Sequence, residues 1–122
     1  MQNTLVNIDF SRHELTCIRR ALEVCTPPTD CNLDQKSIKR CLDNIQRYID
    51  NSSIFAETIN CTFDYNDISL YIQSIDYYKQ GVISYNNKGH VGAISVDELQ
   101  AIIDKFNMQH DMQANKISRM QS

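Results

Sequence analysis

The stretch Phe10-Ser11-Arg12-His13-Glu14-Leu15 contains the signals that begin an α-helix. The Ser11 hydroxyl can accept a hydrogen bond from the backbone N–H of Glu14, while the Glu14 carboxylate reaches back to the N–H of Ser11. Phe10 and Leu15 can then pack together across this capping box. Apolar residues follow at steps of three and four until two prolines interrupt them, which predicts an amphipathic helix. They are Leu15, Ile18, Leu22 and Cys25.

Three further stretches repeat this combination of cap, apolar staple and apolar stripe. Asp34, Asp64 and Ser95 take the capping position, and Gly81 takes the place of a left-handed cap after the third stripe. Because the three signals agree in each stretch, we predict four helices. The later stripes are Ile38, Cys41, Leu42, Ile45, Tyr48 and Ile49; then Ile68, Tyr71, Ile75 and Tyr78; then Leu99, Ile102, Ile103 and Phe106.

The four predicted helices fall into two similar halves. A shift of 53 residues superposes the first helix start on the third, and a shift of 61 superposes the second on the fourth. The second half is therefore eight residues longer (61 minus 53) between its helices. Any two amphipathic hairpins match in part, so common ancestry of the halves stays open at this point.

The extra residues contain two β-prone runs, 82–85 and 90–94, around the turn Asn86-Asn87-Lys88-Gly89. We predict a small β-hairpin-like excursion there, over residues 82–93. The fold class predicted from the whole pattern is all-α. It is a four-helix bundle of two helical hairpins, with the excursion before the last helix, in one helical domain spanning residues 1–122.

Two segments lie outside this pattern. Ile54, Phe55 and Ile59 suit a short helical turn beneath the bundle. The polar tail 107–122 is expected to extend the last helix and then fray.

Charge, hydrophobicity and cysteine content indicate what the protein binds and where in the cell it is located. The net charge is −3 over 122 residues, which argues against binding to nucleic acid phosphates. No apolar run approaches the ~18 residues of a membrane span, and the N-terminus lacks the features of a secretion signal. The five cysteines are an odd number without a C-x-x-C pair, so reduced thiols and a cytoplasmic location are expected.

The sequence contains few residue patterns that are typical of catalytic or metal-binding sites. With three glycines in the chain, no phosphate-binding loop can be written. His13 and Cys17 are four residues apart and could face one metal ion, but no second pair follows at zinc spacing. A cysteine paired with His90 or His110 as a nucleophile stays open. We expect no enzymatic activity, no cofactor and no metal.

One stretch, 87–98, resembles a calcium loop of the EF-hand family. Gly92, Ile94 and Glu98 stand at its sixth, eighth and twelfth places. Gly89 and Val91 stand where calcium needs oxygen ligands, so the interpretation of Glu98 as a helix-capping residue is preferred.

The third predicted helix is apolar on two sides. Leu70 and Tyr77 lie nearly opposite its stripe, with Ser74 between them. Such a helix is either buried on both sides or presents one side to another protein, and the sequence leaves both interpretations open. On the second interpretation, the predicted partner-binding face consists of Leu70, Ser74, Tyr77, Tyr85, Asp67 and Asp76.

Basic side chains gather on the second predicted helix, at Lys36, Lys39, Arg40 and Arg47. We interpret them as a solvated face, although an anionic partner is the alternative.

These observations predict a non-enzymatic protein-binding module. We expect a small cytoplasmic inhibitor, an immunity protein or a phage-type regulator that occludes a partner protein. Alternatives are a homo-oligomeric structural protein that associates through the third helix and a helical domain that binds a small ligand.

Overall fold

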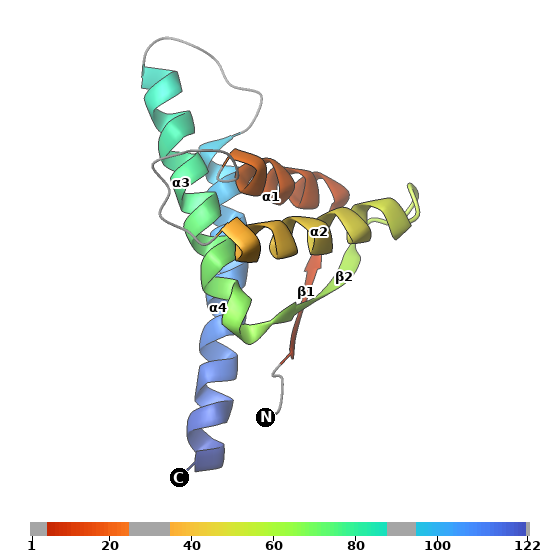
Figure 1. Ribbon diagram of the computed structural model, residues 1–122, viewed down its shortest axis with the longest axis vertical. Coiled ribbons are helices and arrows are strands. Elements are labelled where there is room, and N and C mark those ends of the chain that lie inside the picture. The colour runs from red at the N-terminus through yellow and green to blue at the C-terminus, as the bar shows by residue number, and fades with distance from the viewer. Residues whose placement is uncertain (1–4, 25–34, 88–94, 122) are drawn as a thin grey trace.

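A computed structural model describes residues 5–24, 35–87 and 95–121 (Figure 1). Four α-helices dominate these ranges, as the sequence predicts, and a short 3-10 helix, η1, precedes the third. The elements in chain order are β1 (Leu5–Phe10), α1 (Arg12–Val24), α2 (Gln35–Asn51), β2 (Ile59–Asp64), η1 (Tyr65–Asp67), α3 (Ile68–Asn87) and α4 (Val96–Gln121).

Three predicted helix caps are observed. The Ser11 hydroxyl accepts from the N–H of Glu14 at 3.1 Å, and the Glu14 carboxylate accepts from the N–H of Ser11 at 2.9 Å. The Asp64 carboxylate accepts from the N–H two residues later at 2.9 Å and begins η1, which leads into α3. The Ser95 hydroxyl accepts in the same way at 3.1 Å before α4. The predicted cap Asp34 lies outside the described residues.

The two strands form an antiparallel ribbon that the sequence analysis missed. Its register runs from Leu5 opposite Asp64 to Phe10 opposite Ile59. Along β1 the side chains alternate between exposed and buried, the period of a strand with one face on the core. The alternation covers only six residues and ends at Phe10. The predicted helix start already accounts for Phe10 as the residue that packs on Leu15, so the strand pattern before it was missed.

The β-hairpin-like excursion predicted over 82–93 is wrong in its first part, because α3 continues to Asn87. Gly81 consequently lies inside this helix and does not cap it. Val82 packs against the core from its helical position, whereas an isolated two-stranded ribbon is only marginally stable in water. Residues 88–93 lie outside the described part of the chain.

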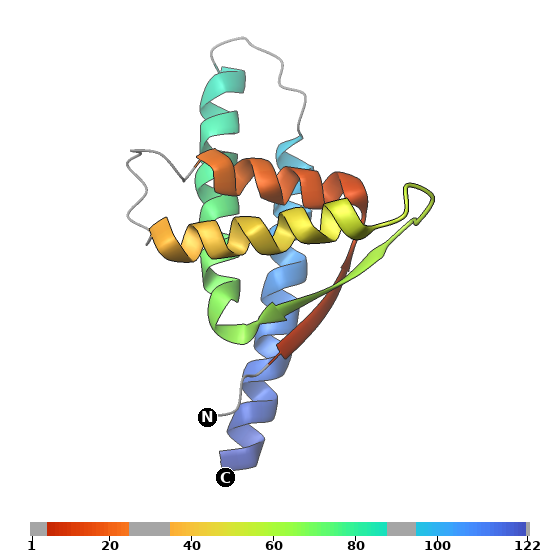
Figure 2. The same ribbon diagram turned by 45° about the vertical axis from the view of Figure 1, so that its right-hand side comes forward.

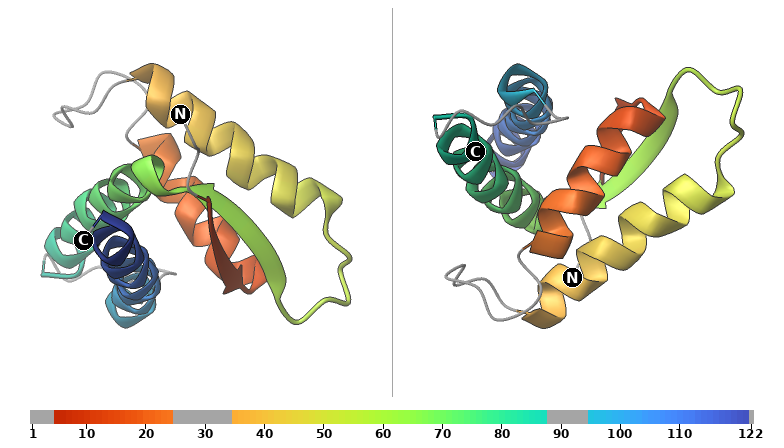
Figure 3. Two further views of the ribbon diagram at one scale, coloured as in Figure 1. Left: turned by 90° about the horizontal axis from the view of Figure 1, so that it is seen from below. Right: turned by 90° about the horizontal axis from the view of Figure 1, so that it is seen from above.

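The two helical hairpins cross each other, and the predicted four-helix bundle of two hairpins is not confirmed. In Figure 2, α1 and α2 lie side by side and run across α3 and α4. In the end views of Figure 3, α3 and α4 point toward the viewer while α1 and α2 lie across the picture. α4 runs on to Gln121 and extends past the ribbon (Figure 1), so the tail does extend the last helix.

The two halves, β1-α1-α2 and β2-α3-α4, repeat the same order of elements. Ile8 pairs with Cys61, which is the residue 53 positions later (61 minus 8). The shift predicted from sequence therefore places equivalent residues opposite each other at the centre of the ribbon. In an antiparallel pair this is the register that a twofold axis through the ribbon produces.

Contacts at the ribbon edges repeat with the same two shifts. The Asn44 amide of α2 donates to the carbonyl oxygen of Thr62 at 3.5 Å. The Lys105 ammonium of α4 donates to the carbonyl oxygen of Asp9 at 3.2 Å. Lys105 follows Asn44 by 61 residues, and Thr62 follows Asp9 by 53. The alignment of the halves thus corresponds to a repeat in the tertiary structure, which favours an origin by duplication.

The centre of the core is a cluster of four aromatic rings from four elements. Phe63 of β2 lies 6.0 Å from Phe10 of β1, 5.0 Å from Tyr71 of α3 and 5.2 Å from Phe106 of α4, measured between ring centroids. All four side chains are fully buried. Each such pair contributes about 0.5–1.5 kcal/mol to stability beyond the burial of its area. Because Phe10 belongs to the first half of the chain and the other three rings to the second, this cluster joins the two halves.

A small buried residue occupies the equivalent place in each half. Ala21 of α1 and Ser74 of α3 are 53 residues apart and both fully buried. α1 and α3 pack against each other, and small buried side chains allow packed helices to approach closely. The Ser74 hydroxyl has no hydrogen-bond partner among the described residues. A buried polar group without a partner costs about 1–3 kcal/mol.

We expect Ser74→Ala to raise the free energy of unfolding by about 1–2 kcal/mol, because it removes the unpaired hydroxyl and favours the helix. Urea denaturation measures the change. Ser84→Ala, at an exposed position of the same helix, is the matched control and should gain only the helix-propensity part, about 0.5 kcal/mol. A loss of stability in Ser74→Ala would show that the hydroxyl has a partner.

Candidate functional site

The face of α3 predicted to bind a partner is only in part a surface. Ser74 is fully buried and cannot contact a partner in this fold, and Leu70 is half-buried against the core. Tyr77 exposes 36% of its surface, and Asp76 is exposed. The Tyr85 side chain lies outside the described part. For Leu70 and Ser74, the alternative of a helix packed on both sides is closer to what is observed.

Among the described residues, the most exposed large apolar side chains lie in the turn between α2 and β2. Ile54 exposes 77% of its surface and Phe55 exposes 88%. The expectation that this segment tucks a helical turn beneath the bundle is wrong, because both side chains point into solvent. No periodic pattern in the sequence distinguishes these two residues from core residues.

The base of this turn is fixed by hydrogen bonds. The N–H of Ala56 donates to the carbonyl oxygen of Ser53 at 3.1 Å, and the N–H of Phe55 donates to the Ser53 hydroxyl at 3.2 Å. The Arg12 guanidinium of α1 donates to the carbonyl and hydroxyl oxygens of Ser52 at 3.0 and 2.7 Å. The apolar tip therefore projects from an anchored base.

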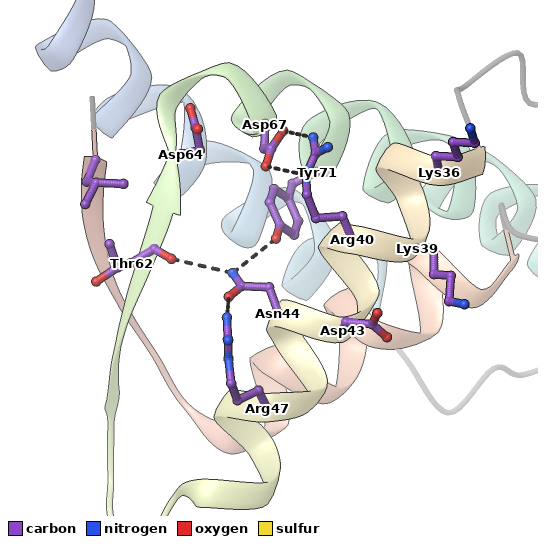
Figure 4. Close-up of a pocket in the computed structure, with 11 residues that line it drawn as sticks. Lys36, Lys39, Arg40, Asp43, Asn44, Arg47, Thr62, Asp64, Asp67 and Tyr71 are labelled. Atoms are coloured by element: carbon purple, nitrogen blue, oxygen red, sulfur yellow. Dashed lines mark hydrogen bonds and ion pairs between the residues drawn. The ribbon is translucent and has the colours of Figure 1, made fainter. Parts of the chain in front are cut away.

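A groove of about 820 Å³ lies between α2 and the exposed face of the ribbon (Figure 4). It collects charged side chains from α2, β2 and η1. The exposed Lys36 and Lys39 lie on α2, and Lys39 lies beside Asp43. Its lining residues are Leu5, Lys36, Lys39, Arg40, Asp43, Asn44, Arg47, Thr62, Asp64, Asp67 and Tyr71.

The polar groups at the groove's centre already bind one another. Arg40 forms an ion pair with Asp67, which the sequence predicts to lie on the partner-binding face. Arg47 donates to the Asn44 side-chain oxygen at 2.6 Å, and the Asn44 amide donates to the Tyr71 hydroxyl at 3.4 Å (Figure 4). This groove can take up a polar or anionic segment.

Three cysteines are described, and all three are free and buried: Cys17, Cys41 and Cys61. Burial raises the pKa of Cys41 to about 11 and that of Cys61 to about 12. A nucleophilic cysteine needs the opposite, a thiolate at neutral pH. His110, one candidate base, stacks on the Tyr65 ring at 4.7 Å, and His90 lies outside the described residues.

In the structure, a third possible metal ligand lies beside His13 and Cys17. Glu98, in the first turn of α4, brings its carboxylate 3.0 Å from Nε2 of His13. Cys17 Sγ lies 3.8 Å from the same nitrogen. The hydrogen bond from His13 holds the pKa of Glu98 below its usual range. Sequence reasoning missed Glu98 because it is 85 residues from His13 and its capping role accounted for it.

Among the described residues, no helix combines the length and the apolar composition needed to cross a bilayer. Comparisons of the chain with models of protein families, with curated proteins and with solved structures each find no match. The function therefore has to be inferred from the residues themselves.

The buried thiols predict a pH dependence. Unfolded cysteines ionise near pH 8.5, whereas Cys41 and Cys61 stay protonated in the fold, so the native state binds more protons above that pH. Their contribution to stability is complete below about pH 8.5 and is lost as the pH rises toward 11 for Cys41 and toward 12 for Cys61. We expect a loss of up to about 2 kcal/mol per thiol between pH 8.5 and 10.

Urea denaturation at a series of pH values measures this effect. A Cys41→Ala/Cys61→Ala variant is the control, since it keeps every other titrating group of the chain. Its stability should fall less steeply with pH than that of the wild type. Equal slopes would contradict the prediction.

Proposed function

We propose that the protein is a non-enzymatic protein-binding module that inhibits a partner by occlusion, in the manner of a small immunity protein or mobile-element regulator. The observation that carries the proposal is the Ile54–Phe55 turn, whose two large apolar side chains are 77% and 88% exposed. Aromatic and aliphatic anchors of this kind dominate the binding energy of protein interfaces when a partner's pocket covers them.

The anchored base of the turn strengthens this argument. Hydrogen bonds from Arg12 and within Ser53–Ala56 restrain the backbone before any partner binds. A restrained segment loses less conformational freedom on binding than a free loop does. The cost of exposing Ile54 and Phe55 to water is then offset when a partner buries them.

The charges near the turn indicate the chemistry of the partner. Asp50, at the end of α2, and Glu57, two residues after Phe55, are both exposed, and the whole chain carries a net charge of −3. We infer a partner with an apolar pocket bordered by basic side chains. Such complementarity speeds the encounter of the two proteins, and the inserted turn blocks the pocket.

We expect the double variant Ile54→Ser/Phe55→Ser to abolish partner binding and to leave the free energy of unfolding within about 0.5 kcal/mol, since both residues are exposed. Quantitative affinity capture from the native host compares it with the wild type. Val24→Ser, at another exposed apolar position, is the matched control and should retain the partner. Equal recovery of the same proteins by the wild type and the double variant would refute the proposal.

Self-association is the second candidate function, and α4 supports it better than α3. Past the ribbon, α4 carries Met108 and Met112 four residues apart, so both lie on one helix face, and both are about half exposed. A second copy could bury this stripe in a helix–helix contact.

Light scattering over a concentration series tests this candidate. If the chain dimerises through α4, Met108→Glu/Met112→Glu should shift it to the monomer, because the contact would bury two carboxylates. The control is Tyr77→Ser on α3, which should leave the dimer intact. A wild-type chain that is monomeric at every concentration excludes self-association and leaves the binding of another protein.

A further inference from the structure

Three side chains from the two halves bring a nitrogen, a sulfur and an oxygen donor together. Nε2 of His13, Sγ of Cys17 and a carboxylate oxygen of Glu98 all lie within 4.8 Å of one another. The nitrogen is 3.0 Å from the oxygen and 3.8 Å from the sulfur. In a tetrahedral zinc site, bond lengths of about 2.0–2.3 Å imply ligand–ligand separations of about 3.3–3.7 Å. Small side-chain rotations therefore suffice to enclose an ion.

The backbone holds these donors in a usable arrangement. His13 and Cys17 are one helical turn apart on α1, so both face the same side of the helix. Glu98 comes from the first turn of α4, where the capped helix start fixes its backbone. His13 and Glu98 are exposed while Cys17 is buried, so an ion can enter from solvent and reach the thiol on the inner side.

We propose that His13, Cys17 and Glu98 form a binding site for a zinc ion that links α1 to α4. Imidazole and thiolate are ligands that zinc prefers, whereas magnesium and calcium require sets of oxygen atoms. On binding, the Cys17 S–H bond breaks, its proton passes to water and a sulfur–zinc bond forms. The thiolate and the carboxylate then balance the two positive charges of the ion, and a water molecule takes the fourth position.

Cobalt(II) titration of the reduced full-length chain tests the site, because tetrahedral cobalt reports its ligands by absorption. We expect one cobalt ion per chain, intense visible bands and a near-ultraviolet thiolate-to-cobalt charge-transfer band, all removed by one equivalent of zinc. Zinc should also raise the midpoint of thermal unfolding, since the ion binds only the folded arrangement.

Variants assign the ligands. His13→Gln and Glu98→Gln remove exposed side chains and should each weaken cobalt binding by about tenfold or more, with unchanged circular dichroism. Cys17→Ala should remove the charge-transfer band. His110→Gln, at the other described histidine, is the matched control and should bind like the wild type.

Three results would overturn the proposal. They are an absent charge-transfer band in the wild type, a cobalt affinity that is unchanged in both His13→Gln and Glu98→Gln, and a cobalt affinity that falls equally in His110→Gln. The inference does not rest on the proposed partner binding, because neither Ile54 nor Phe55 contributes a ligand.

Discussion

The register of the β1–β2 ribbon is the constraint on which the rest of the structure depends. With Ile8 opposite Cys61, the even-numbered side chains of β1 and the buried odd-numbered side chains of β2 point into the core and place Phe10 and Phe63 at its centre. A slip of one residue would turn every side chain of one strand to the other face, so Phe10 and Phe63 could no longer both point into the core. Tyr71 and Phe106 pack on Phe63, so the positions of α3 and α4 follow from this register as well.

The candidate sites lie where the two halves stop resembling each other. The Ile54–Phe55 turn joins the first half to the second and has no counterpart in either. The positions 53 residues after His13 and Cys17 hold Asn66 and Leu70, so the nitrogen and sulfur donors of the proposed zinc site have no equivalent in the second half. A scaffold of two similar halves needs its repeated residues for packing, whereas residues that break the repeat are free to take on a separate function.

The proposed functions use different parts of the molecule and different chemistry. Partner binding relies on exposed apolar surface above a hydrogen-bonded base, while the zinc site relies on polar donors between α1 and α4. The zinc site uses the thiolate of Cys17, whereas the buried Cys41 and Cys61, whose pKa values are raised, take part in neither proposal. In the groove along α2, the central groups Asn44, Arg47 and Tyr71 bind one another.

By itself the sequence determined the helices, because their signals are local. The capping box of Ser11 and Glu14 spans four residues, and the stripe that contains Tyr71 and Ile75 repeats within one or two turns. The tertiary structure alone decided the ribbon, the crossing of the hairpins, the exposure of Phe55 and the approach of Glu98 to His13. Each of these joins or separates residues far apart in the chain. Their positions depend on how whole elements pack, and no pattern within a few residues records that.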